Sequence, residues 1–493
     1  MRRKDYKWLG FILAAAMCTS MLSGCGASGD NQSNADTPTT AVEQTEQAEV
    51  KEEAGSEEIA KEEPAEQEEE AKEETGSGAM TQEEFDALEV TTVIPSDESP
   101  TGYYVTFRYK DPDAARVRIY GEWAFSDIEH ATAFTSLNAT PEEWQDGYTV
   151  WQSNGWPTAD MELNEETGVW SYTIPLPNGT WGYRFYVGGA DGADVKDYTD
   201  AVLAYDPNNV PYLADYTETD LTNEQYMTSV YVPYDAEKQA NTTCVEEQAP
   251  RNGENGTVFF ETVTTEDGTE TSYGVYLPYN FDASREEAYP ILLFYHGGGG
   301  FEGSWFNNGL INILDNMIAE GRMEPTIVVT PNGEDFPDPD EGWDREANLD
   351  FALNNILPHM VEKYNASEEP AKRALGGLSQ GAANVMYGYF HCTDEFDYYI
   401  SLSAPLRNNV YPEYTKEGLD DVRLFLAYGM YDSIVYGPIY KDTIAYGSCY
   451  DYIWGLSQAG VEFEVNTDLH YGHQWALWRE LAVYSFDNIL WKS

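Results

Sequence analysis

The most constraining feature of the sequence is a series of short apolar runs that alternate with helical patterns from Thr257 to the C-terminus. The candidate strands are TVFFETV, SYGVYLP, YPILLFYH, PTIVVTP, RALGGL, DYYISLS, VRLFLAYG and VEFEVNT. Between them apolar residues recur at helical spacing; one such set is Leu349, Leu353, Ile356, Met360 and Tyr364. Apolar strands separated by helices indicate a mainly parallel, doubly wound α/β sheet with helices on both faces. We predict one such domain over residues 257–493.

A different pattern fills residues 89–215, where short runs alternate apolar and polar side chains. The clearest of these runs are YYVTFRY, RVRIYGEW, VWSYTIPL and WGYRFYV. Gly, Pro, Asn and Asp separate the runs, so the pattern predicts an all-β antiparallel sandwich. Residues 216–256 are expected to be a polar connector in which MTSVYVPYD packs as a lone strand.

The N-terminal residues are expected to direct export rather than to fold. A basic segment, MRRKDYK, precedes the apolar run WLGFILAAAM, which is too short to span a bilayer comfortably. The residues that follow, Leu22-Ser23-Gly24-Cys25, resemble the signal box of bacterial lipoproteins, which implies removal of residues 1–24 and attachment of lipid to Cys25. An ordinary secretory signal with a chance cysteine is the alternative. We therefore expect an extracytoplasmic or cell-surface protein that meets the membrane only through this lipid anchor.

Residues 25–88 are rich in Glu, Ala, Ser and Thr and poor in apolar residues, so we predict a disordered acidic linker. The whole chain has a formal net charge of −60 at pH 7. Such a charge opposes binding to nucleic-acid phosphates, because that binding needs clustered Lys and Arg. We expect no nucleic-acid partner.

The tetrapeptide GLSQ occurs twice, in two different contexts. The first copy, within residues 377–381, follows the strand RALGG and opens a helix, with glycine two residues before and two residues after Ser379. Two such glycines suit a sharp strand-to-helix turn, and a helix N-terminus favours negative charge that develops at the serine. The second copy contains Ser457 and lies on an expected helix that ends at Gly460; the helical stripe is Ala445, Cys449, Ile453 and Leu456. We predict that Ser379 is a nucleophile and that Ser457 is not.

A nucleophilic serine needs a base, and the base needs an acid that orients it. In doubly wound hydrolases both partners follow the serine, the acid before the histidine, at the carboxyl ends of strands. Asp432 is the first carboxylate after VRLFLAYG, and His473 follows VEFEVNT in the loop before the last helix. The strand YPILLFYH ends in the loop HGGGG, residues 296–300, whose backbone N–H groups suit an oxyanion hole. The chain order therefore predicts a catalytic triad of Ser379, His473 and Asp432.

These motifs resemble those of the esterase D-type α/β-hydrolases, carbohydrate esterase family one, which include feruloyl and acetylxylan esterases. The resemblance extends over residues 257–491 and is carried by HGGGG, VVTPNG, ILPHMVEKY, RALGGLSQG, YISLSA, GMYDS and GHQWALWRE. It implies an oxyanion hole formed by the amides of Gly298 and Gln380, and a reaction without metal or organic cofactor. One departure is Ala382, where feruloyl esterases usually have a second glycine. The runs before residue 215, with GEW and YDPNN, resemble immunoglobulin-like E-set domains found ahead of bacterial polysaccharide esterases.

The resemblance implies hydrolysis of esters on plant polysaccharide, in the first place feruloyl esters of xylan. Acetylxylan esterase and siderophore esterase are alternatives of the same fold. An alternative of another class is a surface lipoprotein that binds glycans and whose hydrolase fold is catalytically idle. Four aromatic residues near the catalytic loops are candidates for the walls of an acyl slot, although packing alone would also place aromatic residues there: Trp305, Tyr431, Tyr436 and Trp475.

For each of three further groups of residues, two interpretations stay open. Four tryptophans before residue 160 suit sugar stacking, but a small sandwich also buries its tryptophans: Trp123, Trp144, Trp151 and Trp156. The loop GEDFPDPDEGWD offers Asp338 and Asp340 to calcium, but its prolines and spacing favour a solvated loop without metal. Cys392 and Cys449 either form a disulfide or are two small buried side chains.

Overall fold

The computed structural model describes most of the chain after residue 87. The described residues are 88–132, 135–151, 157–188, 202–206, 209, 228–239, 246–265, 268, 270–338, 342–405, 412–419, 421–434 and 449–492. The segment from Ala87 to Ser493 is one compact unit. The expected signal segment, Cys25 and nearly all of the expected linker lie outside the described residues. None of the described helices combines the length and the apolar character that a membrane span requires.

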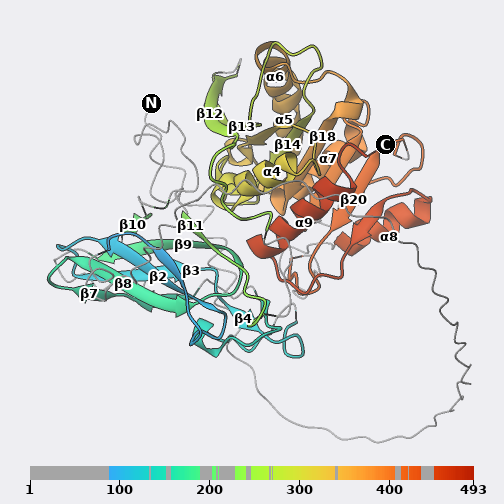
Figure 1. Cartoon of the computed structure of the whole chain (residues 1–493). Helices are drawn as coiled ribbons and strands as arrows, with labels where there is room; N and C mark the ends of the chain where they lie inside the picture. Colours follow the sequence, from blue (N-terminus) through green and yellow to red (C-terminus); the bar gives the residue numbers. More distant parts are fainter. Residues whose placement is uncertain are drawn as a thin grey trace, which may run out of the picture. The chain divides into compact units, whose positions relative to one another are not determined.

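The C-terminal half is built around one eight-stranded sheet (Figure 1), with the strand order β12-β13-β15-β14-β18-β19-β20-β21. The strands are β12 (Thr257–Thr264), β13 (Glu270–Leu277), β14 (Ile291–Tyr295), β15 (Ile327–Pro331), β18 (Arg373–Leu378), β19 (Tyr398–Leu402), β20 (Arg423–Ala427) and β21 (Glu464–Asn466). Pairing is parallel from β15 to β21, and β13 pairs antiparallel with both β12 and β15. All eight predicted strands are confirmed. Numbered within the sheet, their order is 1-2-4-3-5-6-7-8, which is that of an α/β-hydrolase fold.

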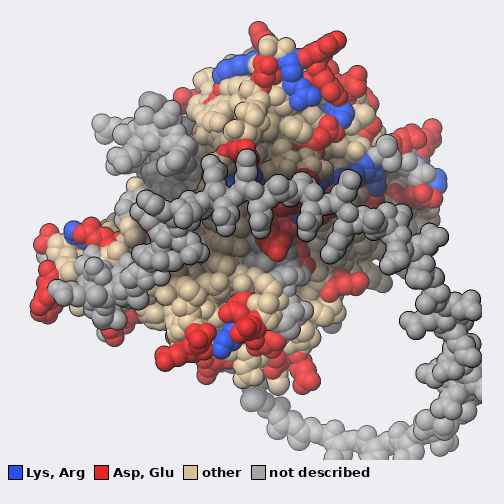
Figure 2. Space-filling view, in the orientation of Figure 1, with Lys and Arg blue, Asp and Glu red and all other residues tan. Residues whose placement is uncertain are grey.

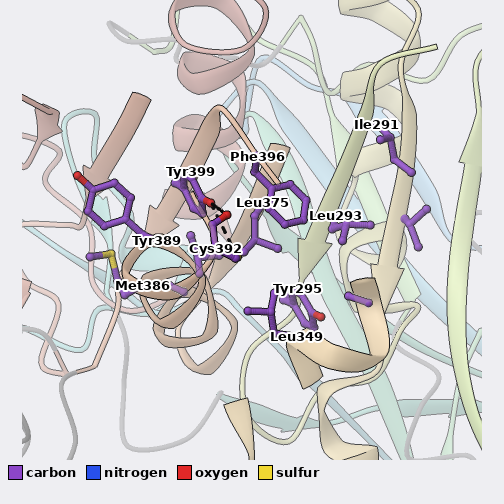
Figure 3. Packing of buried hydrophobic residues seen from close by; sticks show 14 of the residues in the cluster. Ile291, Leu293, Tyr295, Leu349, Leu375, Met386, Tyr389, Cys392, Phe396 and Tyr399 are labelled. Atoms are coloured by element: carbon purple, nitrogen blue, oxygen red, sulfur yellow. Dashed lines mark hydrogen bonds between the residues drawn. The ribbon is translucent and has the colours of Figure 1, made fainter. Parts of the chain in front are cut away.

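Helices bury this sheet between two apolar layers, as the alternating pattern predicts. One layer contains α4 (Leu310–Ala319) and α9 (Trp475–Asn488). The other contains α5 (Arg345–Phe351), α6 (Leu357–Tyr364), α7 (Gln380–His391) and α8 (Cys449–Ala459). Figure 3 shows part of this second layer, where Leu293 and Leu375 of the sheet share a cluster with Met386 of α7. The helical stripe that begins at Leu349 runs through α5, the π-helical turn η4 (Ala352–Ile356) and α6.

The N-terminal part of the compact unit consists of two antiparallel sheets with the orders β1-β2-β8-β7 and β10-β9-β3-β6. Their strands are β1 (Thr92–Pro95), β2 (Tyr103–Lys110), β3 (Arg116–Gly121), β6 (Thr158–Asp160), β7 (Glu162–Asn164), β8 (Val169–Pro175), β9 (Gly179–Gly188) and β10 (Val202–Ala204). A separate ribbon pairs β4 (Phe125–Ser126) with β5 (Thr149–Val150). Phe107 of the first sheet and Tyr183 of the second lie in one buried cluster. The alternating runs thus pair as strands whose inner faces share a core.

The expectation of a lone strand in MTSVYVPYD is wrong. β11 (Thr228–Val232) pairs antiparallel with β9, with Val230 opposite Trp181. Val230 and Val232 are buried in the same cluster as the sandwich core. A strand from the expected connector therefore extends the second sheet.

The tryptophans of this N-terminal part are packing residues where the structure describes them. Trp123, Trp144 and Trp151 are each at most 8% exposed, so they offer no open platform to a sugar ring. Trp156 lies outside the described residues. Burial of aromatic surface in a small sandwich core is the physical reason, because each ring removes a large apolar area from water.

Cys392 and Cys449 are buried and free, so the disulfide interpretation is wrong. Cys392 Sγ donates to the carbonyl oxygen of Gly388 at 3.2 Å. Burial raises the pKa of the Cys392 thiol to about 12, which keeps it protonated. Both cysteines act as small apolar side chains of the core.

A cluster around Glu261 ties the edge strand β12 to helix α6. Its carboxylate accepts hydrogen bonds from Tyr273 Oη at 2.9 Å, His359 Nε2 at 2.8 Å, Tyr364 Oη at 2.7 Å and Lys363 Nζ. Partial burial raises the pKa of Glu261, but the hydrogen bonds from Lys363, Tyr364 and Tyr273 outweigh it, so the pKa lies below its ordinary value. The ionised carboxylate is therefore the form that stabilises this edge.

We predict that Glu261→Gln lowers the free energy of unfolding by about 1.5–3 kcal/mol at pH 7, because hydrogen bonds to a charged acceptor are lost. Because the folded-state pKa is lowered, this contribution is present above the ordinary glutamate pKa and disappears as the pH falls through the folded-state value. Chemical denaturation at neutral and acidic pH measures both effects. Glu362→Gln is the control, because Glu362 is an exposed residue of helix α6. Equal losses from the two variants at pH 7 would contradict the prediction.

Candidate active site

Ser379 occupies a strained turn between β18 and α7. Its backbone has φ 51° and ψ −117°, a conformation that residues other than glycine rarely adopt. The Ser379 N–H donates to the carbonyl oxygen of Leu402 at 2.8 Å, which fixes the turn to β19. A serine in such a strand-to-helix turn presents its hydroxyl at the carboxyl edge of the sheet.

Crowding explains the glycines on both sides of Ser379. A Cβ at Gly381 would collide with the carbonyl oxygen of His296 and lie 2.6 Å from Cβ of Tyr295. A Cβ at Gly377 would lie 2.8 Å from the carbonyl carbon of Gly381. Only glycine fits at either position without a shift of the backbone.

The second tetrapeptide has none of this geometry. Ser457 lies in the last turn of α8 and is exposed. Gly460 follows the helix with φ 75°, and its N–H donates to the Ser457 carbonyl oxygen at 3.1 Å. Ser457 is a helix-end serine.

Ser379, His473 and Asp432 form one hydrogen-bonded series. His473 Nε2 lies 3.0 Å from Ser379 Oγ, and His473 Nδ1 lies 2.9 Å from Asp432 Oδ2. Asp432 is fully buried and His473 is 9% exposed, so water competes little for these bonds. A neutral imidazole in this arrangement donates from Nδ1 to the carboxylate and accepts at Nε2 from the hydroxyl.

Two neighbouring loops deliver the acid and the base. Asp432 follows β20 and His473 follows β21, and these strands pair in parallel. Beyond the strand ends, Met430 N donates to Leu469 O at 2.8 Å and Tyr431 N donates to Tyr471 O at 3.0 Å. The two loops therefore run side by side past the sheet, which brings Asp432 next to His473.

The glycine-rich loop after β14 lies against the serine. A Cβ at Gly297 would be 3.7 Å from Ser379 Oγ, and a Cβ at Gly298 would be 3.1 Å from Cγ of Gln380. The segment that contains the Gly298 amide thus passes beside both Ser379 and Gln380. This proximity suits a pair of N–H donors for an oxyanion.

Hydrogen bonds with the chain segment that follows β15 anchor the glycine-rich loop. His296 Nε2 accepts from Gly333 N at 3.2 Å, which leaves the proton on Nδ1 to bind the Gly297 carbonyl oxygen at 2.7 Å. The Gly299 N–H donates to Glu334 Oε1 at 2.7 Å, and Trp343 Nε1 donates to the same oxygen at 3.0 Å. Sequence reasoning missed His296 and Glu334 in these roles. The signal for the first was available, because the histidine begins the HGGGG motif.

The structure describes three of the four aromatic candidates for an acyl slot, and they differ in exposure and packing. Trp305 is 1% exposed and stacks on Phe294 at 4.0 Å between ring centroids, so it is a core residue and the slot interpretation is wrong for it. Tyr431 is 8% exposed and donates to the carbonyl oxygen of Ile128, so it too is a packing residue. Trp475 is partly exposed and packs edge-on against Trp305 at 5.3 Å. Tyr436 lies outside the described residues.

Trp478 is a neighbour of the imidazole that sequence reasoning missed. Its ring meets the His473 ring edge-on, with centroids 4.8 Å apart, and its indole N–H donates to Ser403 Oγ at 3.1 Å. The available signal was its place in the first turn of the helix that follows His473, because side chains there lean back toward the helix N-terminus. Trp478 therefore packs against one side of the imidazole.

Within the described residues, no three His, Cys, Asp or Glu side chains gather in a way that would hold a metal ion. Asp338 is described and Asp340 is not, so the calcium alternative falls partly outside the described residues.

Comparison with known families and sequences gives similarity to esterases and xylanases. Residues 264–479 match the model of a family described as putative esterase. Over 161 residues the chain is 33% identical to endo-1,4-beta-xylanase Y of Acetivibrio thermocellus, which covers 30% of this chain and 14% of that protein. Over 144 residues it is 30% identical to an endo-1,4-beta-xylanase/feruloyl esterase of Xylanibacter ruminicola. This match covers 28% of this chain and 20% of that protein. The chain spans at most a fifth of the length of these relatives.

Solved structures give weaker similarity. A ferulic acid esterase of Anaeromyces mucronatus aligns with a TM-score of 0.41 and 20% identity, over 50% of this chain and 94% of that one. The enterobactin esterase of Shigella flexneri aligns with a TM-score of 0.49 and 13% identity, over 84% and 98%. The fold assignment rests on the strand order described above.

We predict that Gly381→Ala disturbs the turn at Ser379, because the added methyl group collides with the His296 carbonyl. The free energy of unfolding should fall by about 1–3 kcal/mol, as for other overpacked sites. Reaction of Ser379 with a fluorophosphonate, followed by mass spectrometry, should slow strongly. Ala383→Gly costs about 1 kcal/mol of helix propensity without crowding the turn and should keep the wild-type reaction rate. If both variants react with the fluorophosphonate at the wild-type rate, crowding at Gly381 does not determine the reactivity of Ser379.

Proposed function

We propose that the chain is a serine carboxylic-ester hydrolase. The observation that carries this proposal is the 3.0 Å contact between His473 Nε2 and Ser379 Oγ, with His473 Nδ1 held 2.9 Å from the buried carboxylate of Asp432. A serine hydroxyl is a weak nucleophile until a base takes its proton, and this series supplies the base and its orienting acid. The match of residues 264–479 to an esterase family supports the same chemistry.

The proposed reaction has two steps. Ser379 Oγ attacks the ester carbonyl carbon while its proton moves to His473 Nε2, and the N–H groups of Gly298 and Gln380 stabilise the oxyanion. The imidazolium, stabilised by Asp432, then gives its proton to the departing alcohol oxygen, and the acyl group stays on Ser379. In the second step His473 takes a proton from water, whose oxygen attacks the acyl carbon, and Ser379 Oγ leaves with the proton returned. In this route the chain contributes the nucleophile, the base, its orienting acid and the oxyanion donors, and water is the second substrate.

Feruloyl esters of plant xylan are the proposed substrate class. Support comes from the sequence motifs and from the relatives, one of which is named as a xylanase and one as a xylanase/feruloyl esterase. Acetyl esters of xylan and siderophore esters are alternatives for the same triad. A catalytically idle glycan-binding protein is the alternative of another class, and a nucleophile variant separates it from an enzyme.

The proposed setting is a bacterial cell surface or another extracytoplasmic site, with a lipid anchor at Cys25 and residues 26–88 as a spacer. Residues 89–215 are proposed to be an immunoglobulin-like E-set domain; the two antiparallel sheets with a shared core support this assignment. On the face in Figure 2, Asp and Glu side chains outnumber Lys and Arg side chains. Together with the formal net charge of −60, this supports a neutral polysaccharide or small ester as partner rather than nucleic acid.

We predict that Ser379→Ala lowers kcat on a soluble aryl ester by roughly three orders of magnitude or more, because the nucleophile is lost. Ser457→Ala is the matched control and should leave kcat within about twofold, because Ser457 is an exposed helix-end serine that takes no part in the triad. Steady-state kinetics on both purified variants measures the difference. Equal activity in the two variants would contradict the assignment of the nucleophile.

The substrate class is tested by comparing methyl ferulate with methyl acetate, which has the same leaving alcohol. We predict that kcat/KM for methyl ferulate exceeds that for methyl acetate, because binding energy from the aromatic acyl group lowers the barrier. Preference for the acetate would favour acetylxylan esterase instead. Absence of turnover on both esters would favour the glycan-binding alternative.

A further inference from the structure

The N-terminal β domain touches the catalytic histidine loop on both sides of His473. Thr149 Oγ1 donates to the carbonyl oxygen of His470, three residues before His473. Gln474, the residue directly after His473, donates from Nε2 to the carbonyl oxygen of Val150. Both contacts are made by β5, the two-residue strand of the β4–β5 ribbon. One short strand thus binds the backbone before His473 and the side chain of the residue directly after it.

Residues that flank the same ribbon contact the loop that carries Asp432. Tyr431, directly before Asp432, donates from Oη to the carbonyl oxygen of Ile128 at 3.3 Å. Its ring packs in a small buried cluster with Ala131 and Trp151, which lie beside β4 and β5. The acid loop is therefore fixed against the N-terminal domain as well as against the histidine loop.

A third contact lies on helix α9, which begins two residues after His473. Arg479 is 3% exposed, and its Nη2 donates to the carbonyl oxygen of Thr180 in β9 at 2.6 Å. Its Nη1 donates to the carbonyl oxygen of Asn308 in the α/β domain at 3.3 Å. Nearby Glu122 is buried, which raises its pKa to about 7, although the charge of Arg479 acts in the opposite direction. Arg479 thus joins the helix behind the histidine to the second sheet of the sandwich.

We propose that the N-terminal β domain is part of the catalytic apparatus, and that Thr149, Gln474 and Tyr431 are positioning residues for His473 and Asp432. The inference rests on the ester hydrolysis proposed above. A domain that served only as a spacer or a glycan anchor would have no reason to contact the residues next to the base and the acid. Here one side-chain hydrogen bond involves the residue directly after the base, and one involves the residue directly before the acid. A third falls on the carbonyl three residues before the base. Displacement of a reacting group by about 1 Å costs roughly a hundredfold in rate, so loss of one such contact is measurable.

The test compares two threonine-to-valine changes in the N-terminal domain of the full chain. Thr149→Val removes the hydrogen bond to the His470 carbonyl. Thr106→Val removes a 2.8 Å hydrogen bond to Thr173, between β2 and β8 of the first sandwich sheet. On a soluble aryl acetate, Thr149→Val should lower kcat by about tenfold or more with KM nearly unchanged. Thr106→Val should leave kcat and KM within about twofold of the wild-type values. Its effect on Tm should be similar to that of Thr149→Val. Thr149→Ser keeps the hydroxyl and should retain most of the wild-type kcat.

Tyr431→Phe provides a second variant, which keeps the buried ring and removes only the hydroxyl. It should also lower kcat at unchanged KM, and it carries the test if Thr149→Val fails to fold. If neither variant lowers kcat more than Thr106→Val does, the positioning role is wrong, and an active wild-type enzyme leaves the proposed function intact. If the wild-type protein neither hydrolyses esters nor reacts with a fluorophosphonate at Ser379, the proposed function fails and the inference falls with it.

Discussion

The rest of the site depends on the contact that closes the turn at Ser379. The Gly381 N–H donates to the His296 carbonyl oxygen at 3.0 Å, at the point where β14 passes into its glycine-rich loop. A positive φ at serine costs on the order of 1–3 kcal/mol, and this hydrogen bond, together with that from Ser379 N to Leu402 O, offsets the strain. One contact thus fixes both the nucleophile and the start of the loop proposed as the oxyanion hole. Backbone hydrogen bonds thus set their relative position, and the side chains of His296 and Glu334 hold the rest of the loop.

Much of this arrangement follows from local rules that a sequence displays directly. The eight strands are apolar runs of the right length, and Ser379 is marked by a strand before it, a helix after it and a glycine on each side. Asp432 and His473 are separated by 41 residues but both follow parallel strands. Parallel strands end at one edge of a sheet, so residues at these ends converge wherever they lie in the chain. The sequence order of strand ends was therefore enough to select the acid and the base.

The parts that sequence reasoning missed are contacts whose two partners lie far apart and follow no period. Trp305 was expected beside the substrate because it follows the HGGGG loop, but the short helix α3 (Ser304–Asn307) directs it inward onto Phe294. Tyr431 meets Ile128 across 303 residues, and β11 pairs with β9 from within an expected connector. A local pattern indicates that an aromatic side chain is half buried, but it does not identify the surface that buries it. That information comes from tertiary packing, which lies within one domain for Trp305 and between two domains for Tyr431.

Arg479, which joins the N-terminal β domain to helix α9, contributes more to the orientation of this helix than to stability. Burying an arginine costs free energy, and apolar side chains of similar size would hold two domains together at least as firmly. A guanidinium, however, donates in fixed directions, and Arg479 binds carbonyl oxygens from two segments that are distant in sequence, at Thr180 and Asn308. Two directed bonds restrain the angle of α9 as well as its distance from the sandwich. Because α9 begins next to His473, a restrained helix angle becomes a restrained imidazole, which a hydrogen bond of 3.0 Å to a single hydroxyl requires.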